Sequence, residues 1–212
     1  LMTDPESSGE QALQELVRGM EWYEKAGVDF LEINESCPNV AHGSSTLEAI
    51  TERLEYISRH FLQKRTRNLP VVVKFSTDTA TADVTPLLDV LLSLAYDGVN
   101  FGNTSTQYAR HRTMLHKDDH ALFDYFTQTF GGGVSGEPLR VSSLELVRTA
   151  SNYTASRSLA REFHIIRTGG IATLQDVEES FSAGAALCHW YTGYFERFAE
   201  DGHNLYARLF GK

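Results

Sequence analysis

Short apolar runs alternate with amphipathic segments along almost the whole chain. Apolar positions at helical spacing predict helices over residues 11–25, 45–64, 84–92, 139–162 and 174–183, and a last helix running towards Leu209. Runs rich in β-branched and aromatic residues predict five strands, over residues 28–33, 70–75, 98–101, 164–166 and 186–191. The order is therefore strand, helix, strand from one end of the chain to the other.

This repeat predicts a parallel sheet with helical crossovers, and so an α/β fold in a single domain, residues 1–212. A doubly wound sheet and a (β/α)8 TIM-type barrel both have this repeat, and both carry active sites at the carboxyl ends of their strands. Polar or glycine residues lie at or just after the ends of all five predicted strands: Asn34 and Cys37, Lys74, Asn103 and Thr104, Gly169 and Gly170, and Tyr191 and Thr192. Because every strand end of a barrel faces one mouth, this distribution favours the barrel.

The segment after the first predicted strand reads Asn-Glu-Ser-Cys-Pro-Asn over residues 34–39. A carboxamide donates and accepts hydrogen bonds at once, so Asn34 and Asn39 suit a planar, amide-rich ligand. Cys37 between them has the chemistry of a base or a nucleophile, provided that its thiolate is accessible. The alternative interpretation, a strand end with turn-forming residues and an inert cysteine, explains the same residues about equally well.

Glycine-rich segments point to a phosphate group. Gly169 and Gly170 follow a strand, and Thr173 and the start of the next helix are expected to supply donors to an anion there. Ser135 and Gly136 end a glycine-rich run, and Gly193 follows Thr192. The last strands of a barrel often build a phosphate site in this way, although each glycine also suits a simple turn. Since neither a G-x-G-x-x-G run nor a P-loop is present, the sequence indicates no Rossmann dinucleotide site.

Composition and charge narrow the function classes. Nineteen Lys and Arg stand against 28 Asp and Glu, a net charge of -9, which argues against a nucleic-acid partner. No apolar run is long enough to span a bilayer, no signal peptide opens the chain, and Cys37 and Cys188 lack metal-site spacing. Three histidines between residues 103 and 138 are expected to be solvated residues of a lid rather than zinc ligands, so no metal is expected.

Six motifs occur in the order found in dihydroorotate dehydrogenases. They are residues 34–39, Val-Val-Lys at 72–74, residues 97–105, Gly-Gly-Val-Ser-Gly at 132–136, residues 165–170, and residues 183–192. The resemblance covers nearly the whole chain. It implies an FMN-containing (β/α)8 barrel, with the last five β/α units in this chain, that oxidises dihydroorotate to orotate in pyrimidine biosynthesis.

The resemblance also implies roles for single residues. Cys37 stands at the catalytic-base position, and the substrate ligands are Asn34, Asn39, Asn103 and Thr104. The FMN ligands are Lys74, Ser135, Gly136, Gly169, Gly170, Tyr191 and Thr192. A lysine beside the flavin would stabilise the negative charge that develops on reduction.

Two positions depart from the family pattern: Arg167 precedes the diglycine and is expected to crowd or pair with the phosphate, and Glu35 replaces an apolar residue. The class signals conflict as well. A cysteine base resembles the class 1 enzymes, which use fumarate or NAD and imply a cytoplasmic location. Residues 103–105 and 132–136 resemble the quinone-linked class 2 enzymes, for which the mitochondrial inner membrane is the alternative.

Two other functions stay open. One is a related dihydropyrimidine- or dihydrouridine-type flavin oxidoreductase, and the other is a degenerate barrel without turnover. The three asparagines favour dihydroorotate, and the acidic balance speaks against a tRNA-acting relative. A homodimer is also expected.

Overall fold

The computed structural model describes residues 1–4, 6–35 and 46–211. A parallel sheet has the strand order β1-β2-β3-β4-β5. The strands are β1 (Leu31–Asn34), β2 (Val71–Ser76), β3 (Gly98–Asn103), β4 (His164–Thr168) and β5 (Leu187–His189). Each strand adds beside the previous one without reversal, whereas a doubly wound sheet reverses at a switch point. The sheet is therefore an arc of a barrel, as expected.

Helices follow the strands as the periodicity predicts. They are α1 (Gly9–Ala26), α2 (Leu47–Ile57), α3 (Thr81–Ser93), α4 (Tyr108–Arg112), α5 (His120–Thr129), α6 (Arg140–Ala155), α7 (Leu174–Ser182), α8 (Thr192–Asp201) and α9 (Leu205–Leu209). Short turns are η1 (Ser58–Leu62, a π-helix), η2 (Lys117–Asp119), η3 (Glu137–Leu139) and η4 (Gly202–Asn204).

Two predicted helices are wrong in extent. The helix expected over residues 139–162 ends at Ala155, because the Ser156 hydroxyl donates to the Tyr153 carbonyl at 2.7 Å and competes with the helical bonds. The last helix breaks into α8 and α9 at Gly202, whose φ of 53° lies in the left-handed region. The first and last strands are also shorter than expected.

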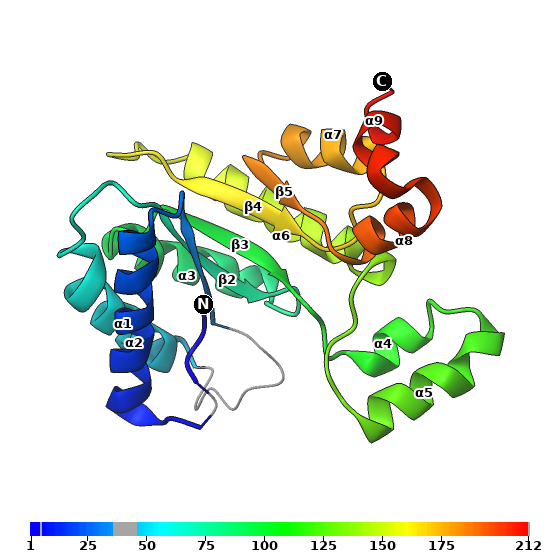
Figure 1. Ribbon diagram of the computed structural model, residues 1–212, viewed down its shortest axis with the longest axis horizontal. Coiled ribbons are helices and arrows are strands. Elements are labelled where there is room, and N and C mark those ends of the chain that lie inside the picture. The colour runs from blue at the N-terminus through cyan, green and yellow to red at the C-terminus, as the bar shows by residue number, and fades with distance from the viewer. Residues whose placement is uncertain (5, 36–45, 212) are drawn as a thin grey trace.

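The two faces of the sheet differ in character. One face presents apolar residues to the helices and forms the core: Leu31, Ile33, Val71, Val73, Phe75, Val99, Phe101 and Ile165. Helices α3 and α6 pack on this face (Figure 1). Because side chains alternate along a strand, residues of the other parity point to the opposite face. In a barrel, that opposite face lines the interior.

Residues 106–133 form an arm between β3 and β4. A pair of hydrogen bonds between the backbones of Ser105 and Val134, at 3.0 and 2.8 Å, closes its base. The arm contains α4 and α5 and projects away from the sheet (Figure 1). The long interval predicted as a lid is thus a helical hairpin with its own base.

Candidate active site

Two predicted substrate ligands meet at the carboxyl edge of the sheet. Asn34 ends β1 and Asn103 ends β3, and the Asn103 Nδ2 donates to the Asn34 Oδ1 at 3.0 Å. The side chain of Thr104 lies against the backbone of Gly133, where a Cβ would approach its hydroxyl to 1.8 Å. Cys37 and Asn39 lie outside the described residues. Strand β2 lies between β1 and β3, and the two side chains meet across it because parallel strands end at the same edge of the sheet.

A polar cluster lies on the face opposite the core. Glu32 Oε1 lies 3.6 Å from Lys74 Nζ, and Glu32 Oε2 accepts from Asn100 Nδ2 at 2.8 Å. The same Asn100 nitrogen lies 2.9 Å from the Thr168 hydroxyl, and His189 Nδ1 lies 3.9 Å from Glu32 Oε2. We call these five residues the inner-face cluster. Lys74 and Asn100 are paired in register, Thr168 and His189 pair with each other two residues further along β4 and β5, and Glu32 lies two residues before the β1 partner of Lys74.

The inner-face cluster has two electrostatic features. Asn100 is fully buried, and its Oδ1 has no hydrogen-bond partner within the part of the chain that the structure describes. Burial lowers the pKa of His189, Glu32 opposes that shift, and Lys74 adds to it. A buried acceptor without a partner is costly, so it marks a place where a ligand donor is favourable.

The glycine segments converge as predicted. The Ser135 and Thr192 hydroxyls lie 2.9 Å apart, and a Cβ on Gly136 would come within 3.0 Å of Thr192. Gly170 has a φ of 72°, and a Cβ there would lie 2.3 Å from the Cα of Arg140, so only glycine fits. Thr192 opens α8, and the first amides of a helix lack intrahelical partners. This group of segments is a physically reasonable anion site.

Tyr191 joins this region through its backbone only. It precedes α8 as the N-cap residue, and its side chain is 72% exposed. The ring contacts Phe195 edge to face, with centroids 5.0 Å apart. The aromatic ring therefore points into solvent instead of into the glycine segments.

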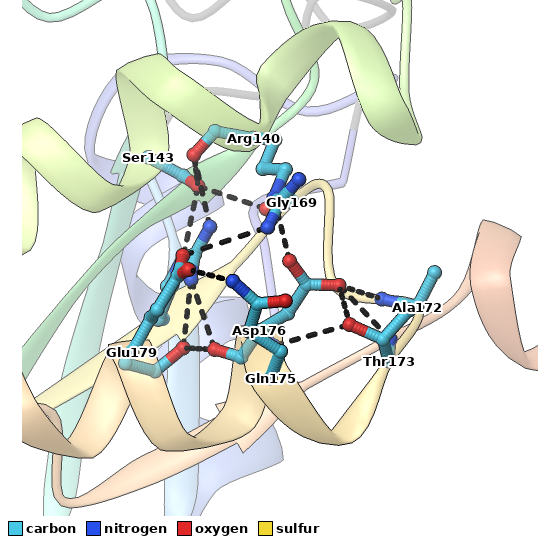
Figure 2. Close-up of polar contacts among 10 residues, drawn as sticks. Arg140, Ser143, Gly169, Ala172, Thr173, Gln175, Asp176 and Glu179 are labelled. Carbon is cyan, nitrogen blue, oxygen red and sulfur yellow. Dashed lines mark hydrogen bonds and ion pairs between the residues drawn. The ribbon is translucent and has the colours of Figure 1, made fainter. Parts of the chain in front are cut away.

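The N-terminus of α7, where Thr173 was expected to donate to an anion, already holds a carboxylate. Asp176 Oδ2 accepts hydrogen bonds from the Thr173 hydroxyl at 2.7 Å and from the Thr173 and Ala172 amides at 2.9 and 3.1 Å (Figure 2). Burial alone would raise the pKa of Asp176, but these hydrogen bonds outweigh it and lower that pKa. The capping box consumes the Thr173 donors, so the expectation for Thr173 is wrong.

Arg167 does not face the glycine segments, contrary to expectation. Its guanidinium is fully buried on the helix side of β4 and donates to the Ser143 and Ser180 hydroxyls and to the Arg140 and Asp176 carbonyls. The reason is strand parity: Thr168 occupies the inner face, so its neighbour Arg167 points outward. Glu35 is likewise accommodated, by Arg53 of α2 at 2.9 Å.

One histidine of the arm is buried, which contradicts the expectation of solvated lid residues. His111 is 2% exposed and its Nε2 lies 2.6 Å from the Ser105 hydroxyl, which donates to Asp78 Oδ1 at 2.5 Å. Since the serine proton goes to the carboxylate, the His111 Nε2 must carry the proton of the other bond. In the described residues no group of three or more His, Cys, Asp or Glu side chains suits a metal ion.

Sequence reasoning missed Glu32, Asn100, Thr168 and His189. A signal was present in the sequence. Side chains alternate between the two faces of a strand, and all four residues occupy strand positions that point to the same face of the sheet as Lys74. Reading only the residues after each strand overlooked the inward-pointing residues within it.

Comparison with known proteins identifies the family. A profile described as "Dihydroorotate dehydrogenase" matches residues 6–200. The chain is 30% identical over 168 residues to a dihydroorotate dehydrogenase (quinone) of Kocuria rhizophila, covering 78% of this chain and 43% of that protein. It is 28% identical to the mitochondrial quinone-type protein of Kluyveromyces lactis, over 93% of this chain and 43% of the relative.

Solved structures agree on the fold. The chain matches ligand-free DHODH of Eimeria tenella with a TM-score of 0.71 and 20% identity, over 97% of this chain and 55% of that one. It matches the ferulenol complex of the same protein with a TM-score of 0.67 and 22% identity, over 88% and 50% of the two chains.

The chain thus spans about half the length of the relatives it matches. None of the helices that the structure describes is long and apolar enough to cross a membrane. The extent of the family match, over residues 6–200, agrees with the sequential parallel sheet and with the six motifs. The chain belongs to the dihydroorotate dehydrogenase family.

Proposed function

We propose that the protein containing this chain is an FMN-dependent oxidoreductase that converts dihydroorotate to orotate. The observation that carries the proposal is the hydrogen bond between Asn34 and Asn103 at the carboxyl edge, beside the inner-face cluster and the glycine segments. Family membership supports the same reaction class. In this proposal residues 1–212 are one domain, the second part of a barrel that the rest of the protein completes.

The substrate side of the site is built from carboxamides. The bond between Asn34 and Asn103 fixes the orientation of both amides, which suits the imide and carboxylate groups of a dihydropyrimidine. Asn39 and Thr104 are proposed as further substrate ligands. Cys37 is proposed as the base that takes the proton from the ring carbon next to the one that loses hydride.

The residues present fit FMN. The Ser135 and Thr192 hydroxyls, the glycine backbones at 136, 169 and 170, and the start of α8 offer hydrogen-bond donors to a phosphate. Asn100 Oδ1 offers a buried acceptor, and Lys74 offers a cation on the inner face. FMN, when bound, accepts the hydride equivalent from the substrate. Tyr191 is proposed to contribute its backbone, since its ring is exposed.

The proposed second acceptor is a quinone. The relatives reported above carry "quinone" in their names, which favours the class 2 side of the sequence signals over fumarate or NAD. One of those relatives is named as mitochondrial. The cysteine base would then combine with quinone-type loops in one protein. Membrane association and a homodimer remain predictions from the sequence.

The test uses the purified full-length protein. We expect a flavin absorption spectrum at near-stoichiometric loading, anaerobic bleaching by dihydroorotate, and reoxidation by a soluble ubiquinone analogue. Reoxidation by fumarate or NAD instead would overturn the quinone assignment and leave the dehydrogenase assignment intact. Bleaching by dihydrouracil or a dihydrouridine substrate, but not by dihydroorotate, would favour the related oxidoreductase. A protein without flavin would be a degenerate barrel.

A further inference from the structure

Arg167 lies behind the glycine segments, on the helix side of β4. Its guanidinium donates at 3.1 Å to Ser143, at 2.8 Å to Ser180, at 2.9 Å to the Arg140 carbonyl and at 3.2 Å to the Asp176 carbonyl. All four acceptors are neutral hydroxyls or carbonyls. A buried guanidinium is costly unless it is fully hydrogen-bonded, so this set of partners must repay a large desolvation cost.

Two of these bonds lead to the diglycine. The Ser143 hydroxyl accepts from Arg167 Nε and donates to the Gly169 carbonyl at 2.8 Å (Figure 2). The second bond holds the carbonyl of Arg140, whose backbone abuts Gly170 so closely that no Cβ fits between them. Arg167 therefore ties the start of α6 to the diglycine by two independent routes.

The start of α6 is also continuous with the second glycine segment. The Leu139 amide donates to the Gly136 carbonyl at 3.0 Å, and Ser135 contacts Thr192 of α8. The position of Ser135 and Gly136 relative to Gly169 and Gly170 thus depends on where α6 begins. A small residue at position 167 would leave that spacing to packing alone.

We propose that Arg167 is a positioning residue that sets the spacing of the two glycine segments for the phosphate of FMN. Arg167 touches neither the substrate nor the cofactor. It acts through Ser143 and Arg140, and its effect is therefore specific to ligands that carry the phosphate. This inference rests on the proposed flavin site and adds to it a residue from behind the glycine segments.

The test compares FMN with riboflavin, which lacks the phosphate. Dissociation constants for both are measured by flavin fluorescence on the flavin-free, full-length protein. Arg167→Met and Ser143→Ala should each lower the ratio of FMN to riboflavin affinity by about tenfold, equivalent to ~1.4 kcal/mol. Arg167→Lys should behave like Arg167→Met, because an ammonium keeps the charge but loses the rigid fork.

Ser180→Ala is the matched control. Ser180 is as buried as Ser143 and accepts from the same guanidinium, but it leads to α7 and not to the diglycine. It should lower the melting temperature and leave the affinity ratio unchanged. If Arg167→Met and Ser143→Ala lower stability like Ser180→Ala without changing the ratio, Arg167 is structural only and the inference fails. If only Arg167→Lys kept the wild-type ratio of FMN to riboflavin affinity, the positive charge and not the rigid fork would account for the effect. That result would also overturn the positioning role.

Flavin binding by the wild-type protein separates a failure of the proposed function from a failure of the role of Arg167. A wild-type protein that binds neither flavin would overturn the proposed function, and the inference with it. A wild-type protein that prefers FMN, together with variants that keep this preference, would overturn the inference alone. Should Arg167→Met fail to fold, Ser143→Ala still decides, because it removes one hydroxyl and keeps the guanidinium.

Discussion

Replacing Asn103 by alanine is the most direct test of the proposed substrate site. Asn103 is 9% exposed at the end of β3, and its Nδ2 donates to Asn34 Oδ1 at 3.0 Å. Its loss removes one neutral hydrogen bond in the free protein, worth about 0.5–1.5 kcal/mol net. If the same amide binds an anionic substrate, the charged bond is worth about 1.5–3 kcal/mol.

The expected result for Asn103→Ala is therefore a fall in kcat/KM of about 10- to 150-fold, since about 1.4 kcal/mol corresponds to a factor of ten. Stopped-flow flavin reduction by dihydroorotate on the full-length protein measures it, with each rate normalised to bound flavin. A double-mutant cycle with Asn34→Ala should return a coupling of about 0.5–3 kcal/mol, because the two side chains are in contact. Asn152→Ala is the control, since Asn152 is exposed on α6.

If Asn103 only supports the fold, its replacement lowers the melting temperature and the flavin content while the normalised rate stays the same. An Asn103→Ala protein with full flavin content and an unchanged kcat/KM would show that this carboxamide does not bind substrate. Simple additivity in the cycle with Asn34 would show that the observed hydrogen bond carries no functional weight.

Three further predictions follow from the sequence and the fold. Cys37→Ala should slow flavin reduction by about 10²–10⁴-fold with flavin binding intact, and Cys37→Ser should keep part of the rate; an unchanged rate in stopped flow would exclude a base. Burial lowers the pKa of His111 below its ordinary 6.5, and Asp78 opposes this shift, so the folded arm favours the neutral ring. The arm should therefore lose protection against hydrogen exchange as the pH falls from about 6.5 towards that lower pKa. His111→Gln should abolish this pH dependence. Residues 1–212 alone should bind FMN poorly, because an arc of five strands leaves two open edges; titration of this segment with FMN tests the point, and tight binding by a monomer would contradict it.

The sequence by itself determined the class of fold and the location of the chemistry. The alternation of apolar runs with amphipathic segments predicted the five parallel strands and the helices between them, because the spacing of apolar residues within each segment is a local property of the sequence. Polar residues after the strands identified the carboxyl edge, where Asn34 and Asn103 do meet. The helix ends at Ser156 and Gly202 were missed because the pattern of apolar residues does not reveal a side-chain hydrogen bond or a left-handed glycine.

Tertiary structure decided which face each side chain takes and which groups pair. The sequential strand order separated the barrel from the doubly wound sheet, which no local pattern distinguishes. Parity along β4 turned Arg167 away from the glycine segments and into hydrogen bonds with α6 and α7. Burial of His111 and the pairing of Glu35 with Arg53 likewise depend on contacts between residues distant in sequence. Such contacts join elements that are distant in the sequence, so charge pairing and burial at these positions are fixed only when the elements pack together.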